Sequence, residues 1–78
     1  NHASNRFTVI EVNARERPAL LYHLAYALYQ SKVTLHSAHI ATYGERAVDT
    51  FYLTDLTGDR IVSPTRLKTL EKRLLTAA

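Results

Sequence analysis

The chain contains only two prolines, and each stands at the start of a stretch in which leucines recur at helical spacing. Proline fits the first position of a helix, because the N–H that it lacks has no partner there anyway. The first proline, Pro18, therefore predicts a helix over residues 18–30. At about 100° per residue, its core face gathers Leu20, Leu24, Ala27, Leu28 and Ser31, with Leu21 at the edge.

The second proline predicts a second helix, over residues 63–77. Ser63 directly before Pro64 is a typical start, because a serine hydroxyl at the N-cap accepts a hydrogen bond from the first turn. Leucines then repeat at spacings of three and four residues, at Leu67, Leu70 and Leu74. This spacing places them on one face of an amphipathic helix.

Three stretches with alternating hydrophobicity predict strands over residues 7–13, 32–43 and 46–54, the second beginning as a connection. In the third strand Ala47, Asp49, Phe51 and Leu53 face one way, and Val48, Thr50 and Tyr52 face the other. Gly44 and Glu45 predict a hairpin turn, and Gly58 marks a turn in the loop that follows. We expect Leu35 to be buried where the chain enters the sheet.

The element order is therefore β-α-β-β-α, which predicts an α+β fold with a ferredoxin-like layout. In that layout an antiparallel sheet carries both helices on one face. We expect residues 1–6 to be a linker or tail and residues 7–78 to be one domain, because 78 residues suffice for one core only. The full layout has a fourth strand, which we expect to be absent here, and we therefore expect the first strand to be an unprotected sheet edge.

Composition excludes several classes of site. The chain has no cysteine, so it forms no disulfide and no thiolate metal site. Hydrophobic residues make up 46% and charged residues 22%, as in soluble globular domains. The absence of cysteine also fits the cytoplasmic location that we expect. We expect no membrane contact, because no apolar run is long enough to span a bilayer. The net charge of +3 is dispersed, so we expect no nucleic-acid partner.

No arrangement of residues predicts catalysis or metal binding. His36 and His39 are three residues apart in a strand region, so we expect them on opposite sheet faces. Phe51 and Tyr52 are adjacent and point apart, whereas an RNA-recognition sheet needs aromatics on one open face. For Asp49 we expect a hydrogen bond to a neighbouring loop. We expect no catalytic residue, no metal ligand and no cofactor.

Three tyrosines, Tyr22, Tyr26 and Tyr29, cluster on the side of the first predicted helix opposite its core face. Aromatic residues gathered on an exposed face are typical of interfaces. One interpretation is that the domain pairs with a second copy or with a sister domain. The other is that these are scattered surface tyrosines, which soluble proteins tolerate.

The turn from the first strand into the first helix, residues 13–21, is a candidate ligand site. A strand that leads directly into a helix N-terminus exposes backbone N–H groups and a positive dipole end. Such a place suits a small carboxylate, including that of an amino acid, and Asn13 is placed to bind either pole of that ligand. The alternative is that Asn13 and Glu16 merely satisfy the N–H groups of the helix itself.

Two stretches resemble the ACT domains, which are small amino-acid-sensing modules. The segment RERPALL at residues 15–21 resembles their Asp-Arg-Pro-Gly-Leu-Leu signature. The segment AHIATYGERAVDTFYLTD at residues 38–55 resembles the C-terminal ACT domain of enzymes that attach UMP to the PII nitrogen-regulatory protein and remove it again. The resemblance extends over residues 7–77. Glu16 stands where the signature has Asp, and Ala19 where it has Gly.

The resemblance implies a glutamine-sensing regulatory domain that is no enzyme by itself. In that family a nucleotidyltransferase domain and an HD-type hydrolase domain precede two tandem ACT domains, and PII is the partner of the whole enzyme. ACT ligands lie at an interface between two domains, near the first strand–helix loop. Here that implies Asn13, Arg15, Glu16, Arg17, Pro18, Ala19 and Leu20 as ligand-binding residues. The alternatives are a pairing module that transmits the signal without ligand, and a nucleic-acid-binding ferredoxin-like domain.

Overall fold

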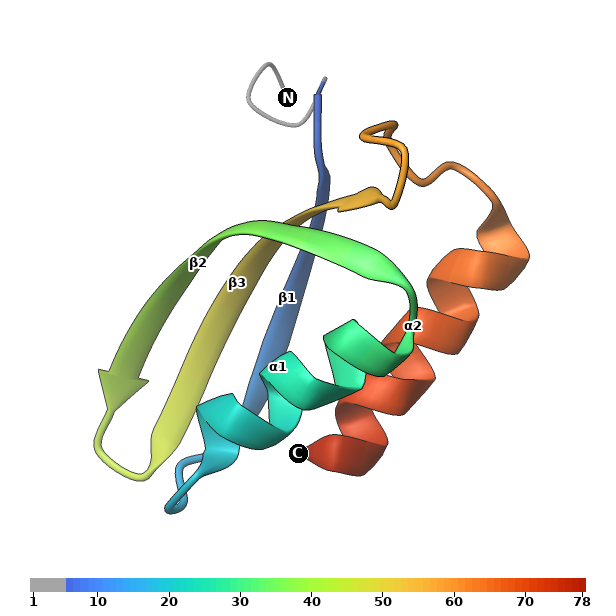
Figure 1. The fold of residues 1–78 in the computed structure, drawn as a ribbon. Coiled ribbons are helices and arrows are strands. Elements are labelled where there is room, and N and C mark those ends of the chain that lie inside the picture. Colours follow the sequence, from blue (N-terminus) through green and yellow to red (C-terminus); the bar gives the residue numbers. More distant parts are fainter. Residues whose placement is uncertain (1–5) are drawn as a thin grey trace.

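The computed structural model describes residues 6–78 and has the predicted element order, β-α-β-β-α (Figure 1). The elements are β1 (Thr8–Arg15), α1 (Leu20–Gln30), β2 (Val33–Tyr43), β3 (Arg46–Asp55) and α2 (Pro64–Ala77). Both helices lie on the same side of the sheet in Figure 1. The α+β, ferredoxin-like prediction is therefore confirmed. Of the predicted tail, residues 1–5 lie outside the described residues.

The sheet of residues 6–78 has three strands in the order β1-β3-β2, with β3 in the centre. Both pairings are antiparallel, so β1 and β2 run parallel to each other on either side of β3. The predicted position of the first strand at a sheet edge is confirmed. Its boundaries differ from the prediction, because β1 continues through Ala14 to Arg15, which pair with Ala47 and Arg46.

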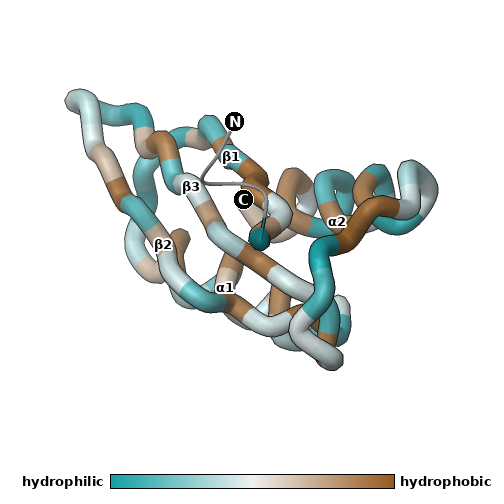
Figure 2. The backbone as a smooth tube through the Cα atoms, turned by 90° about the horizontal axis from the view of Figure 1, so that it is seen from above, coloured by the Kyte–Doolittle hydropathy of each residue, from teal (hydrophilic) through white to brown (hydrophobic). Residues whose placement is uncertain are grey.

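The core lies between the sheet and the helices. Alternate residues of β1 and β3 point toward it, and Phe51 and Leu53 at its centre have no exposed surface. The helices supply the other half, and hydrophobic residues recur along both in Figure 2. The buried helical residues are Leu20, Leu24, Ala27, Leu28, Leu70 and Leu74. Burying one such leucine stabilises the fold by about 1.5–3 kcal/mol, so the predicted core faces hold the helices to the sheet.

The loop before α2 is fixed to the start of β1. The hydroxyl of Thr8 donates to the carbonyl of Ile61 at 3.1 Å and accepts from its N–H at 2.8 Å. Ser63 then accepts from the N–H of Arg66 at 3.3 Å, as predicted for an N-cap. These contacts set where α2 begins and direct it back across the sheet.

The prediction that Leu35 is buried is wrong, since 40% of its surface is exposed. Leu35 pairs with Leu53 on the helix side of the sheet, but β2 is the outer strand there and is exposed along most of its length. In Figure 1 the far end of β2 extends past both helices. Apolar residues on this strand, including Ile40 at 44% exposure, therefore remain accessible.

The prediction that His36 and His39 lie on opposite faces is also wrong. The register of β2 shifts between Leu35 and Ser37, so a β-bulge inserts one extra residue and reverses the alternation. His36 packs on Phe7 with ring centroids 5.0 Å apart, on the sheet face without helices. His39 pairs with Thr50 and lies on that same face.

The first helix begins two residues later than predicted. Pro18 precedes the helix, and Ala19 is its N-cap, with a left-handed backbone at φ 63° and ψ 13°. The chain turns sharply here, because the N–H of Leu20 donates to the carbonyl of Arg17 at 3.1 Å. Ala19 therefore occupies a conformation that glycine adopts without steric cost and alanine does not.

We expect Ala19→Gly to raise the free energy of unfolding by about 0.5–1 kcal/mol. Relief of the left-handed strain, about 1–2 kcal/mol, exceeds the added freedom of glycine in the unfolded chain, about 0.4–1 kcal/mol. Urea denaturation measures the change. The matched control is Ala25→Gly inside α1, which lowers stability by about 1 kcal/mol. Equal destabilisation by both variants would contradict the assigned strain.

Candidate functional site

The loop between β1 and α1 is held at both ends. The N–H of Glu16 donates to the carbonyl of Glu45 at 2.7 Å, and the exposed side chains of Arg15 and Glu45 form an ion pair at 2.9 Å. On the other side, the Arg17 guanidinium donates to the carbonyl of Ala78 at 2.9 Å and to that of Ala77. A cation suits this place, because the last carbonyls of a helix carry partial negative charge.

A pocket of about 580 Å³ lies beside this loop, at the N-terminus of α1. It brings together five of the seven predicted ligand-binding residues with four residues from α1, β2 and β3. Its lining residues are Glu16, Arg17, Pro18, Ala19, Leu20, Leu21, Tyr22, Ile40 and Asp49. Whether these residues bind a ligand stays a prediction.

The remaining two predicted residues, Asn13 and Arg15, are exposed and do not line this pocket. They alternate with the core residues Val12 and Ala14 and therefore point to the sheet face without helices. There the Asn13 side-chain oxygen accepts a hydrogen bond from Arg46 at 2.8 Å. The structure thus separates Asn13 and Arg15 from the other five predicted residues.

Asp49 is the polar residue that the sequence analysis did not place in this site. It lies on the core face of β3, between Val12 and Ile40 on the neighbouring strands, and only 2% of its surface is exposed. The prediction that it binds a neighbouring loop is wrong: Oδ1 is buried and accepts no hydrogen bond from the described residues. The sequence did contain an indication of this burial, because Asp49 shares one strand face with the apolar Ala47, Phe51 and Leu53.

Burial raises the pKa of the Asp49 carboxyl above its usual range, and the nearby Glu16 carboxylate raises it further. Both effects disfavour the ionised form. A carboxylate with no cation and no hydrogen-bond donor beside it is costly in a protein core. Perturbed carboxyls of this kind gather at functional sites.

The N-terminus of α1 supplies the opposite polarity. No side chain caps it, and the N–H of His23 donates to the Ala19 carbonyl at 3.0 Å. Among residues 6–78, no hydrogen-bond acceptor is found for the N–H groups of Leu21 and Tyr22, which both line the pocket. The alternative in which Glu16 caps the helix is thus not seen. The lining of the pocket thus includes two residues with N–H groups unpaired among residues 6–78, Leu21 and Tyr22, and two with carboxyls, Glu16 and Asp49.

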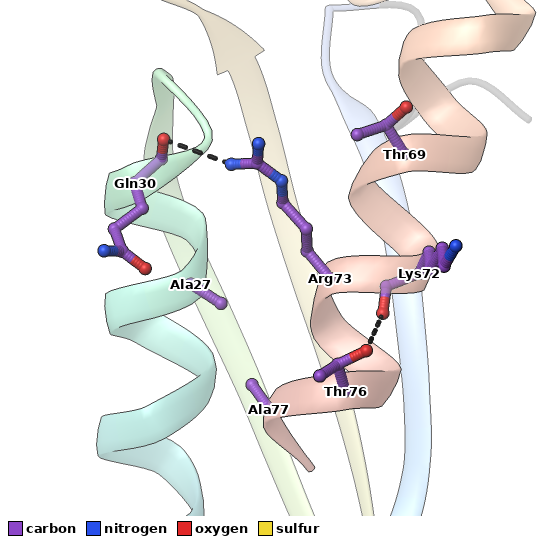
Figure 3. A pocket seen from close by; sticks show the side chains of 7 residues that line it. All are labelled: Ala27, Gln30, Thr69, Lys72, Arg73, Thr76 and Ala77. Carbon is purple, nitrogen blue, oxygen red and sulfur yellow. Dashed lines mark hydrogen bonds between the residues drawn. The ribbon is translucent and has the colours of Figure 1, made fainter.

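A larger groove, of about 790 Å³, runs between α1 and α2 (Figure 3). Arg73 bridges it by donating to the carbonyl of Gln30 at 3.4 Å, and Thr76 bonds the carbonyl of Lys72 within α2. Small and exposed side chains form the rest of its walls. The polar groups that line this groove are hydrogen-bonded or exposed to solvent. Among residues 6–78, the groove therefore has no buried polar side-chain atom without a partner, such as Oδ1 of Asp49.

Tyr22, Tyr26 and Tyr29 lie on the outer face of α1 as predicted, and 49–78% of their surfaces are exposed. They stack in sequence, with successive ring centroids 6.3 Å apart. Tyr22 belongs both to this stack and to the pocket. The predicted interface residues are therefore contiguous with the predicted ligand site.

Other kinds of site find no support in residues 6–78. That part of the chain contains no group of three or more His, Cys, Asp or Glu side chains able to hold a metal ion. His36 is engaged by the hydroxyl of Thr54 at 2.8 Å. Phe51 is buried while Tyr52 lies on the opposite face, as predicted. No helix in residues 6–78 has the length and hydropathy needed to cross a membrane.

We expect Asp49→Asn to be more stable than the unmodified chain at about pH 7. The folded pKa of Asp49 lies above the unfolded one, so ionisation lowers stability as the pH rises through that interval. The gain should shrink toward about pH 3, where the carboxyl is largely protonated in both states. Urea unfolding at the two pH values measures it, with the exposed Asp59→Asn as control. A less stable Asp49→Asn at both values would contradict the unpaired state of this carboxyl.

No protein-family model matches the chain. Among curated proteins, it is 67% identical over all 78 residues to the bifunctional uridylyltransferase/uridylyl-removing enzyme of Novosphingobium aromaticivorans. It is 63% identical over the same length to the enzyme of that name from Zymomonas mobilis, and 59% identical to that of Erythrobacter litoralis. The chain spans 8–9% of the length of these relatives. It is therefore similar, from end to end, to a short segment of bifunctional uridylyltransferase/uridylyl-removing enzymes.

Proposed function

We propose that this chain is an ACT-type regulatory domain of a bifunctional uridylyltransferase/uridylyl-removing enzyme, and that it senses glutamine. The 67% sequence identity over all 78 residues to one of those enzymes and the β-α-β-β-α fold support this proposal. Residues 7–78 form the domain, which carries no catalytic residues and needs no cofactor. The reaction on PII takes place in catalytic domains elsewhere in a cytoplasmic parent enzyme.

The pocket at the start of α1 is the observation that carries the proposal. It lies at the strand–helix turn that the ACT resemblance singles out, and it is lined by Glu16 through Leu20. The free N–H groups of Leu21 and Tyr22 are placed to bind a carboxylate. A zwitterionic amino acid, which needs donors for one end and an acceptor for the other, fits this distribution of charge.

The two departures from the ACT signature are compatible with this pocket. Ala19 adopts the left-handed backbone that explains why glycine is usual there, so its methyl group alters strain and leaves the course of the chain intact. Glu16 lines the pocket and adds negative charge next to Asp49. The two departures therefore change the backbone strain and the charge of the site and keep its position in the fold.

We expect L-glutamine to raise the midpoint of thermal unfolding selectively among the twenty amino acids. A ligand at about 100 times its dissociation constant stabilises the folded state by about 2.7 kcal/mol. For a domain of this size that corresponds to a shift of roughly 10 °C or more. L-Glutamate and D-glutamine serve as matched controls. No shift with any amino acid would contradict a self-sufficient sensor.

The tyrosine stack supports a second candidate function, a pairing module that joins a sister ACT domain or a second copy of itself. Three stacked, exposed tyrosines on one helix face form an apolar surface of the kind found at interfaces. The adjoining β2 leaves Ile40 exposed beside them. In this function the domain transmits the signal whether or not it binds the ligand.

We expect sedimentation equilibrium to show self-association that the double variant Tyr22→Ser, Tyr29→Ser weakens by about tenfold or more, since aromatic anchors dominate interface energies. Tyr43→Ser is the matched control, because Tyr43 is equally exposed but lies at the end of β2. A monomer at every concentration, or equal weakening by the control, would contradict self-pairing through this face.

A further inference from the structure

The pocket at the start of α1 contains an ionisable group with no hydrogen-bond partner for one of its oxygens among residues 6–78. Asp49 lines the pocket, and only 2% of its surface is exposed. Its Oδ1 atom accepts no hydrogen bond from any donor among residues 6–78. Folded proteins almost always pair such an atom. Because Asp49 lines the pocket, a bound ligand is the natural source of the missing donor.

The surrounding charges define what that donor is. Glu16 is the second carboxylate of the pocket, so this side is negative. The one cation in the lining, Arg17, is committed to the carbonyls of Ala77 and Ala78. A positively charged donor from the ligand satisfies both the missing hydrogen bond and the missing charge.

We propose that Asp49 is the specificity-determining residue of this pocket: it accepts a hydrogen bond from the protonated amine of the ligand, so that the site selects amino acids over simple carboxylic acids. This inference rests on the proposed function, in which the pocket holds the ligand. The N–H groups of Leu21 and Tyr22 bind the carboxylate at the other end. Both ends form charge-assisted hydrogen bonds, but only the amine distinguishes an amino acid from a simple carboxylic acid, so its bond to Asp49 is the source of this selectivity.

Binding through Asp49 is linked to a proton. The titratable and charged groups that line the pocket with Asp49 are Glu16 and Arg17 from the loop and Tyr22 from α1. On the neighbouring strands, Asp49 pairs with the apolar Val12 and Ile40. Burial and Glu16 raise the pKa of Asp49 in the free protein, and an ammonium beside it favours the ionised form. At a pH between the pKa values of Asp49 in the free and the bound protein, ligand binding therefore releases a proton to the buffer, a signature that a purely structural aspartate does not produce.

Titration calorimetry with two probes tests the proposal. L-Glutamine carries the amine, and glutaramic acid has the same carboxylate and amide without it. For the unmodified chain we expect glutamine to bind at least about tenfold more tightly, with proton release seen as a heat that varies with the ionisation enthalpy of the buffer. In Asp49→Asn we expect glutamine affinity to fall by about tenfold or more, to the level of glutaramic acid, and proton release to disappear.

Two control variants keep the outcomes separate. Asp59→Asn makes the same change in an exposed loop and should leave both affinities unchanged, and urea unfolding verifies that Asp49→Asn is folded. Equal binding of the two probes by the unmodified chain would overturn the role of Asp49 and leave the pocket standing. Loss of selectivity in Glu16→Gln but not in Asp49→Asn would assign the amine to Glu16 and overturn the proposal. Binding of neither probe would overturn the proposed function together with it.

Discussion

The alternation along β3 is the constraint on which the rest of this structure depends. As the central strand it pairs with both neighbours, so its inward residues determine what β1, β2 and the two helices pack against. Ala47, Phe51 and Leu53 in that row are buried and apolar. Asp49 interrupts the row at the point where α1 begins, and the sheet thereby places a carboxyl at the base of the pocket.

The same corner of the domain departs from the rules that hold elsewhere in the fold. Within the part of the chain that the structure describes, Ala19 has a left-handed backbone, α1 starts without a side-chain cap, and Oδ1 of Asp49 is buried without a hydrogen-bond partner. By contrast α2 begins with Ser63 and Pro64, the residues that favour a helix start. Local features that lower stability and gather at one place are expected where a protein keeps a binding site. Their common position supports one site at the start of α1.

Periodicity predicted the element order, the core faces of both helices and the exposed tyrosine stack, because each depends on spacings within a single element. It did not predict the bulge beside His36 or the exposure of Leu35, because both depend on how β2 pairs and on where the helices end above it. The late start of α1 was missed because Pro18 is compatible with a helix, while the turn at Ala19 is set by contacts with Arg17.

The candidate site was predicted in part. The loop residues from Glu16 to Leu20 follow one another in the sequence and line the pocket together. Asn13 and Arg15 fall on the other sheet face, because both alternate with the core residues Val12 and Ala14 in a strand that continues to Arg15. Asp49 is more than 25 positions away along the chain, and only the pairing of β3 with β1 and β2 brings it to the loop.

Backbone amide NMR during a titration with L-glutamine tests the central claim most directly, that the start of α1 is the ligand site. The account predicts that the largest shifts occur at the amides of Leu21, Tyr22 and Asp49. Shifts gathered instead along the α1–α2 groove, at Gln30 and Arg73, would contradict it, as would the absence of any shift at saturating glutamine.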